Sequence, residues 1–440
     1  MAEPAREAFR HAAQASSPLH DRARFDFLHG LRGLAALSVV LFHATLNARG
    51  SQSLWLRAVQ APLLHGYLAV PAFLVLSGFL LSVPVVTNGF ALRGGLPGFM
   101  RRRAVRILPP YYAAYLLDML FFTGAAWLGS AIGKDPGHAV RTQMGIGYQQ
   151  PTVLAHLLLV HNLSHEWVQG MDPILWTIGC EWQIYLLFAL VLVPAWRRAG
   201  TVAVLGVSGL LCATLTEASV RGWCCYFMPS MIPVFSIGMV AGVIVMGTGP
   251  HATAMRSWRW GRIVMAACVV TCAGVGLLDA LVPDTPPRTN PVAYYVWSFR
   301  LRWIYDLLGA LMTASVIVWL AVDARHGGWS ATWARRVRAA LESRPLFALG
   351  MFAYSLYLTH GIALVSVLRA TTFLLSRPLL HDIVVTAAGV AVSLATGYCF
   401  YLGVERHCMS RETRSMFAPT NGRLLSVAPS AATVGRTDPD

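Results

Sequence analysis

The chain has 440 residues, of which 56% are hydrophobic and 12% charged, and its mean hydropathy is +0.54. Soluble globular proteins carry about 25% charged residues, so this composition excludes a chain of two or three soluble domains and predicts a polytopic membrane protein. The net charge of +15 could indicate nucleic-acid binding, but the distribution of the arginines along the chain argues against it. We expect membrane lipid as a partner and no nucleic acid.

The elements follow one another along the chain as apolar segments between polar ones. Residues 1–24 are polar and predict a cytoplasmic tail without the core of a signal peptide. A spanning helix needs about 20 mostly apolar residues, and a membrane domain over 25–408 contains ten such segments. They cover 28–47, 68–86, 107–129, 174–195, 201–218, 228–247, 262–282, 301–322, 346–368 and 383–404. The run 153–163 is too short to span and is predicted to be re-entrant or interfacial. Residues 409–440 predict a disordered cytoplasmic tail.

Ten spans place both termini on the same side of the membrane. Of the 35 Lys and Arg residues, 24 fall on that side, ten fall on the other, and Arg32 lies within the first span. The positive-inside rule therefore places both termini in the cytoplasm. We predict an all-α integral membrane protein with about ten transmembrane helices, in the cytoplasmic (inner) membrane of a bacterium. Gly238 and Gly242, four residues apart, indicate close helix packing.

Metal and disulfide chemistry are not indicated. The eight cysteines have no paired CxxC spacing. His161 and His165 are four residues apart and could both face a metal ion, but two ligands do not make a zinc site. We predict no metal.

The first predicted span carries an arginine and a histidine. Arg32 and His43 are eleven residues apart, which on a helix is three turns plus about 20°, so both face the same way with an axial separation of roughly 16 Å. With Arg32 at the cytoplasmic interface, His43 lies near the middle of the bilayer. Ionisable groups at that depth are usually functional. For Arg32 alone, snorkelling to the lipid headgroups is the competing explanation.

Three later stretches add polar side chains. Arg103 and Arg106 precede the third span and could bind phosphate, although cytoplasmic loops are basic for topological reasons as well. Glu181 and Tyr185 share one face of the fourth span, where Glu181 either balances a buried cation or belongs to an active site.

Tyr357 and His360 share a face of the ninth span, with His360 near mid-depth. A hydrogen-bonded packing histidine is the competing explanation for His360.

Five stretches, in order, resemble the motifs of one family. The segment RGLAALSVVLFH resembles the first-helix Arg-x10-His motif of the membrane-bound acyltransferase family 3. The others are FLVLSGFLL (73–81), RRRAVRILPPYY (101–112), LWTIGCEWQIY (175–185) and YSLYLTH (354–360). The chain departs from many relatives at Pro71 and Trp182, where acidic residues often stand. The second departure leaves Glu181 as the only carboxylate of its motif.

The resemblance implies a ten-helix enzyme that O-acylates sugars, glycans or small molecules. The expected donor is cytoplasmic acyl-CoA, most simply acetyl-CoA, used as a substrate with no bound cofactor. On this hypothesis Arg32, Arg103 and Arg106 hold the CoA phosphates, His43 is the general base and Glu181 orients it. The acceptor or the oxyanion is shaped by a supporting set: Ser77, Trp176, Tyr185, Tyr357 and His360. Ser77 and Cys180 are possible nucleophiles, but direct attack is preferred.

Two other classes compete with an enzyme. A proton-coupled secondary transporter also uses Arg, His and Glu within its helices, but the sequence has no inverted repeat of the kind many transporters show. A membrane scaffold would leave Arg32, His43, Glu181 and His360 without a purpose.

Overall fold

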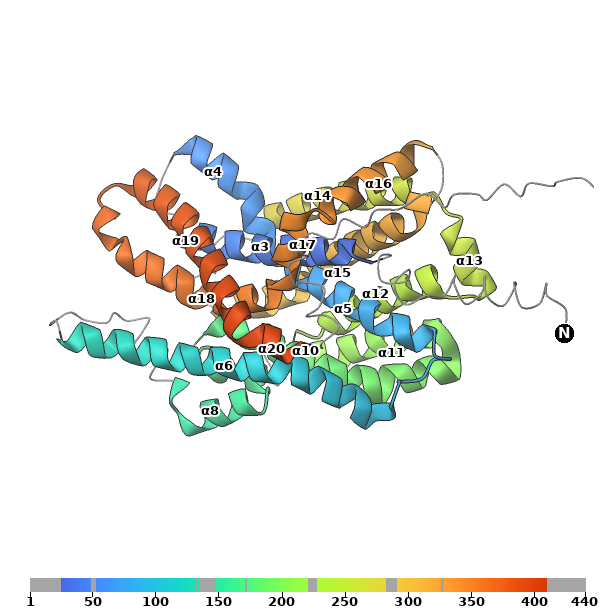
Figure 1. Cartoon of the computed structure of the whole chain (residues 1–440), viewed down its shortest axis with the longest axis horizontal. Helices are drawn as coiled ribbons and strands as arrows, with labels where there is room; N and C mark the ends of the chain where they lie inside the picture. Colours follow the sequence, from blue (N-terminus) through green and yellow to red (C-terminus); the bar gives the residue numbers. More distant parts are fainter. Residues whose placement is uncertain are drawn as a thin grey trace, which may run out of the picture.

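The computed structural model describes residues 25–48, 53–131, 133, 147–170, 172–220, 228–281, 291–325 and 328–409. Within these ranges all regular structure is helical and no strand occurs (Figure 1). The predicted tail 1–24, and all but the first residue of the predicted tail 409–440, lie outside the described residues.

Within the described residues, seven segments are long and apolar enough to cross a membrane, and nine when two bent helix pairs are each counted as one span. The seven include α3 (Phe27–Asn47), α6 (Gly95–Ala131) and α14 (Trp260–Leu281). The others are Leu54–Val86, which ends in α5 (Ala69–Val86); Pro173–Ala218; Arg302–Val322 of α15 (Pro291–Val322); and Pro378–Cys408, which contains α19 (Pro378–Phe400). The predicted all-helical membrane architecture is therefore confirmed, while the side on which the termini lie stays a prediction.

The longest of these segments contains the fourth and fifth predicted spans. It begins with η3 (Pro173–Leu175), continues through α10 (Trp176–Leu187) and a π-helical turn, η4 (Phe188–Leu192), and runs into α11 (Val193–Val220). Gly200 interrupts α11 with φ 76° and ψ −172°. Glycine tolerates this backbone because it has no Cβ. The interruption falls between the two predicted spans, so they are two helices that meet at Gly200.

Two boundaries differ from the prediction. The third span was placed at 107–129, but α6 begins at Gly95, so Arg103 and Arg106 lie on the helix and not in a loop before it. Residues 99–108 are mainly Arg, Met, Ala, Ile and Leu, which favour helix, and Pro97 lies in the first turn, where proline is tolerated.

The ninth predicted span is broken at Phe352. It consists of α17 (Arg344–Met351) and α18 (Ala353–Ala370), which are bent by 72°. The sixth span, α12 (Met231–Met246), is likewise followed by a short helix, α13 (Pro250–Arg256), at 89°. The break at Phe352 lets α17 pack against the start of α3, where a Cβ on Gly350 would lie only 1.9 Å from the carbonyl oxygen of His29.

Close helix packing holds the centre of the bundle. A Cβ on Gly238 would lie 2.2 Å from the carbonyl oxygen of Val75, and one on Gly242 would lie 2.0 Å from Oγ of Ser82, so the predicted role of this glycine pair is confirmed. Helix α3 lies in the middle, packed against η1 (Ala61–Leu68), α5, α17, α18 and α19 (Figure 1). The helix that carries Arg32 and His43 is thus the central one.

The run 153–163 does not span. It forms α8 (Gln150–Leu157) and a 3₁₀ turn, η2 (His161–Leu163), before the short α9 (His165–Val168). Helix α8 lies outside α6 at the edge of the bundle (Figure 1).

Candidate functional site: a histidine pair and an arginine cluster

The two predicted histidines meet. Nε2 of His360, on α18, lies 3.3 Å from Nδ1 of His43, on α3, and the ring centroids are 5.1 Å apart. Nδ1 of His43 also lies 3.0 Å from the carbonyl oxygen of Val39, and Nδ1 of His360 lies 2.7 Å from that of Tyr357. Both imidazoles are therefore held by the backbone of their own helices.

These carbonyls decide which ring nitrogens carry protons. A carbonyl oxygen only accepts, so Nδ1 of each histidine must donate. In the neutral rings Nε2 then carries the lone pair. Nε2 of His360 accepts from the Nδ1–H of His43, and Nε2 of His43 has no hydrogen-bond partner among the described residues. His43 thus presents a free base nitrogen whose opposite side is fixed by Val39 and His360.

The histidine pair has one open side. The His360 side chain is fully buried, whereas His43 is only partly buried. Behind His360, the Tyr357 hydroxyl donates to the carbonyl oxygen of Ile174 at 2.8 Å and accepts from Oγ1 of Thr177 at 2.7 Å. These bonds fasten α18 to the start of α10.

A second polar group lies further along α3. Glu181 of α10 accepts hydrogen bonds from Oγ of Ser77, at 3.1 Å, and from the Tyr185 hydroxyl. Electrostatic interactions join Glu181 to Arg32 and to Arg103, and these interactions extend to Arg106. We call Arg32, Arg103 and Arg106 the arginine cluster.

The guanidinium groups of the arginine cluster lack partners. None of the three makes a hydrogen bond to another described residue, and Nε of Arg103 is buried without one. The guanidinium of Arg103 lies 5.9 Å from the centre of the Phe99 ring. Arg106 is exposed and Arg32 and Arg103 are half-buried, so the cluster is open to a ligand, and its fork-like donors suit phosphate.

Sequence reasoning missed a second carboxylate in this region. Glu405 ends a π-helical turn, η7 (Tyr401–Glu405), and interacts electrostatically with Arg32 and Arg106. It accepts from the amide and the hydroxyl of Ser355 at 3.1 and 2.5 Å. Three arginines therefore face two glutamates, which leaves one positive charge in surplus. In the sequence, Glu405 stands at the end of the last span, where a charged residue is expected to lie at the membrane interface.

Two predicted roles are not met by the geometry. Glu181 was expected to orient His43, but Ser77 and Tyr185 are the residues that hydrogen-bond to Glu181, and Val39 and His360 hold His43. The carboxylate interacts with Arg32 and Arg103 instead. Trp176 begins α10 and makes no hydrogen bond to either group within the described residues.

Asp172 was also missed. It is buried and caps η3, with its Oδ1 accepting from the amide of Ile174 at 3.0 Å. Burial raises the pKa of its carboxyl to about 6. A Cβ on Gly361 would lie 2.1 Å from its Oδ2, so the carboxyl rests against α18 next to His360. In the sequence, an aspartate before a proline indicates an ordinary helix cap. Asp172 has that role in the structure, so its position beside α18 could not be predicted.

Neither a metal site nor the main cavity coincides with this centre. The described residues contain no group of three or more His, Cys, Asp or Glu side chains arranged to hold a metal ion. His161 stacks on His156, while the side chain of His165 lies outside the description.

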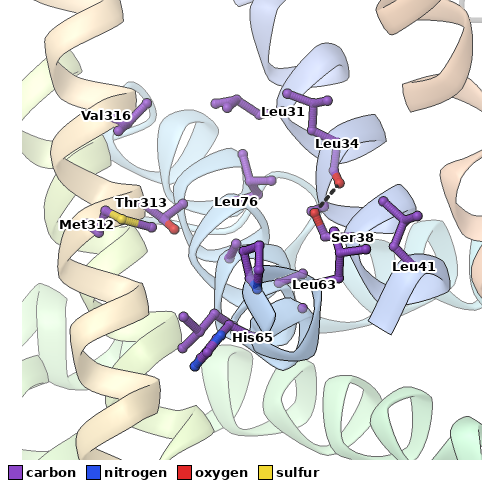
Figure 2. A pocket seen from close by; sticks show the side chains of 16 residues that line it. Leu31, Leu34, Ser38, Leu41, Leu63, His65, Leu76, Met312, Thr313 and Val316 are labelled. Carbon is purple, nitrogen blue, oxygen red and sulfur yellow. Dashed lines mark hydrogen bonds between the residues drawn. The ribbon is translucent and has the colours of Figure 1, made fainter. Parts of the chain in front are cut away.

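A cavity of about 310 Å³ lies between α3, η1, α5 and α15 (Figure 2). On α3 it is lined by Leu31, Leu34, Ser38 and Leu41, on a different face of the helix from Arg32 and His43. Its lining is mostly Leu and Ala, so it offers little to an acyl-transfer reaction.

Comparison with known proteins identifies the family of the chain. Residues 25–402 match the family model described as "Acyltransferase domain". The chain is 25% identical over 414 residues to the "Putative membrane-bound transacylase BcsY" of Komagataeibacter xylinus, which covers 91% of this chain and 87% of that protein. No solved structure matches significantly. With its apolar helices the chain is an integral multi-pass membrane protein, and it belongs to the membrane-bound acyltransferase family 3 that its first-helix motif resembles.

Proposed function

We propose that this membrane acyltransferase transfers an acyl group, most simply acetyl, from cytoplasmic acyl-CoA to a hydroxyl group of a sugar, glycan or small-molecule acceptor. His43 is the general base, and the arginine cluster binds the CoA phosphates. The observation that carries the proposal is the geometry at Nδ1 of His43, which lies 3.0 Å from the carbonyl oxygen of Val39 and 3.3 Å from Nε2 of His360. With Nδ1 as the donor, Nε2 is left as a free base.

The donor assignment is supported by the arginine cluster. A CoA molecule carries a pyrophosphate and a ribose phosphate, and three guanidinium groups without hydrogen bonds offer the charge and the donors to match them. Glu181 and Glu405 interact electrostatically with the arginines and balance part of their charge. The remaining positive charge favours an anion over a neutral ligand.

The chemistry then follows from the histidine pair. Nε2 of His43 takes the proton of the acceptor hydroxyl as its oxygen attacks the thioester carbonyl. The C–S bond breaks, an ester forms, and the departing thiolate takes the proton from His43 to leave as free CoA thiol. The imidazolium that exists between these steps is stabilised by the Val39 carbonyl and by Nε2 of His360. His360 thus occupies the orienting place that a carboxylate takes in a catalytic triad.

The test measures acetyl transfer and thiol release together. Purified protein in lipid nanodiscs receives radiolabelled acetyl-CoA and membrane extract as the source of acceptor. His43→Gln is expected to lower kcat by about 100-fold or more, the usual contribution of a general base, with acetyl-CoA binding unchanged. His360→Gln is expected to lower kcat less than His43→Gln.

His251→Ala is the matched control, because His251 is an exposed histidine on α13. Full activity in His43→Gln would refute the assignment of His43 as the general base. An absence of thiol release in the wild type, combined with proton uptake by sealed vesicles on addition of solute, would indicate a transporter instead.

A further inference from the structure

Buried polar atoms without hydrogen-bond partners gather on α6 and α8. Both carboxyl oxygens of Asp118, the hydroxyl of Tyr115 and Oγ1 of Thr152 are buried and have no hydrogen-bond partner within the described residues. Tyr115 and Asp118 lie one turn apart on α6, and Thr152 lies one turn before His156 on α8. The Tyr115 ring stacks on His156 at 4.6 Å, so these side chains form one group, which we call the α6–α8 group.

Packing alone does not explain this group. A buried polar atom without a partner loses its water and gains nothing in return, and a buried carboxyl with two such oxygens is the most unfavourable case. Several of them in one place indicate a ligand that supplies the missing hydrogen bonds. An isolated Asp within the apolar stretch LLDMLFF would otherwise be selected against on stability.

The α6–α8 group lies beside the reaction centre. Asp118 interacts electrostatically with Asp172, whose carboxyl rests against Gly361, the neighbour of His360. Asp118 is twelve residues beyond Arg106 on α6, and His43 is eleven beyond Arg32 on α3, so both lie roughly 16–18 Å along their helices from the arginine cluster. The group therefore lies about as far along α6 from the arginine cluster as His43 does along α3, away from the donor phosphates.

The chemistry of the group selects the ligand. An anion finds no cationic imidazole in the group, because burial lowers the pKa of His161, which stacks on His156, to about 4. Carboxyl oxygens accept hydrogen bonds, and the Tyr115 and Thr152 hydroxyls can donate or accept. A neutral compound with several hydroxyl groups supplies both kinds of partner, and the stacked rings of Tyr115 and His156 offer a flat face to a sugar ring.

We propose that the α6–α8 group is the acceptor site and binds a neutral polyhydroxyl compound through Asp118, Tyr115 and Thr152, with one hydroxyl reaching His43. This inference rests on the proposed function. The group is enclosed in the present structure, held by hydrogen bonds from the Tyr111 and Tyr112 hydroxyls to the carbonyls of His156 and Leu157. The acceptor therefore enters when the segment 147–170 moves away from α6.

The experiment separates acceptor binding from donor binding. Three soluble probes, methyl α-D-glucopyranoside, methyl β-D-galactopyranoside and N-acetylglucosamine, are titrated as acceptors with radiolabelled acetyl-CoA in nanodiscs. We expect at least one probe to accept label. In Asp118→Asn and in Thr152→Val, the KM for that probe is expected to rise at least tenfold while the KM for acetyl-CoA stays within twofold.

Two controls distinguish this role from a structural one. Asp279→Asn removes an exposed carboxylate on α14, bonded to His65 and Tyr305, and should leave both KM values unchanged. Because Asp118 has no hydrogen bond to lose, Asp118→Asn should keep or raise the melting temperature, whereas a structural carboxylate would lower it on substitution.

Each other result overturns something specific. An acceptor KM within twofold of wild type in Asp118→Asn overturns this inference alone, and so does an active enzyme that acylates membrane extract but none of the three probes. A sodium or potassium dependence that Asp118→Asn abolishes assigns the carboxyls to a cation and overturns it too. A wild type that releases no thiol with any acceptor overturns the proposed function, and this inference with it.

Discussion

Replacement of Arg103 by glutamine is the most direct perturbation of the arginine cluster. Its guanidinium is half-buried, lies against Phe99 and has an unpaired Nε. A hydrogen bond to a charged group contributes about 1.5–3 kcal/mol. Loss of about 2 kcal/mol corresponds to a rise of about 30-fold in the Kd for acyl-CoA, at 1.4 kcal/mol per tenfold. Stability should change little, because the fold makes no hydrogen bond to this guanidinium.

Calorimetric titration of purified protein with acetyl-CoA, without acceptor, measures this effect. Arg102→Gln is the matched control, since Arg102 lies beside Arg103 on α6 but is exposed and donates to the carbonyl oxygen of Arg93 at 2.7 Å. Its Kd should stay within about twofold, as expected of a surface charge. Equal weakening by both variants would refute a defined phosphate site and indicate only general attraction to a basic surface.

Two further predictions concern stability. Gly350→Ala should destabilise the protein by about 1–3 kcal/mol, the usual range for overpacking, because the new Cβ would collide with the carbonyl of His29. Gly206→Ala, in open space on α11, should leave the melting temperature equal or higher, and a similar fall in both would contradict the steric reasoning. Burial lowers the pKa of His161 to about 4. Its contribution to the free energy of unfolding is therefore complete above about pH 6.5 and is lost as the pH falls towards 4. At pH 5 the loss is about 2 kcal/mol. The melting temperature of wild type should therefore fall more from pH 7 to 5 than that of His161→Phe. Parallel curves of melting temperature against pH for the two proteins would disprove this prediction.

The sequence predicted the elements of the site better than their pairing. Helical spacing placed Arg32 and His43 on one face of the first span. In the structure Arg32 lies with the arginine cluster at one end of that face, and His43 pairs with His360 at the other end. The sequence placed both His43 and His360 near mid-depth but did not predict that they pair. Hydropathy located the spans, because it depends only on the bilayer as solvent, and even the boundary at Gly200 was found.

The missing parts depend on tertiary contacts. Glu405 meets the arginines only because the last span contains a π-helical turn, which is rare and often found at functional sites. The partner of Glu181 could not be read from i,i+4 spacing, because Ser77 and the arginines come from other helices. Asp118 was visible as a charge inside an apolar span, but its significance depends on Asp172 and the α8 segment, which approach it from distant parts of the chain.

The separation between donor site and base is set by helices and not by loops. Helix α3 carries Arg32 and His43 about 16 Å apart. Helix α10 carries Thr177, bonded to Tyr357 behind the histidine pair, and one turn further on Glu181, which interacts with the arginines. Helix α3 thus fixes the distance between Arg32 and His43. If the proposed function holds, this is the distance between the phosphates of a bound donor and the base that acts at its thioester, and a thioester without its nucleotide would have no phosphates for the arginine cluster to hold.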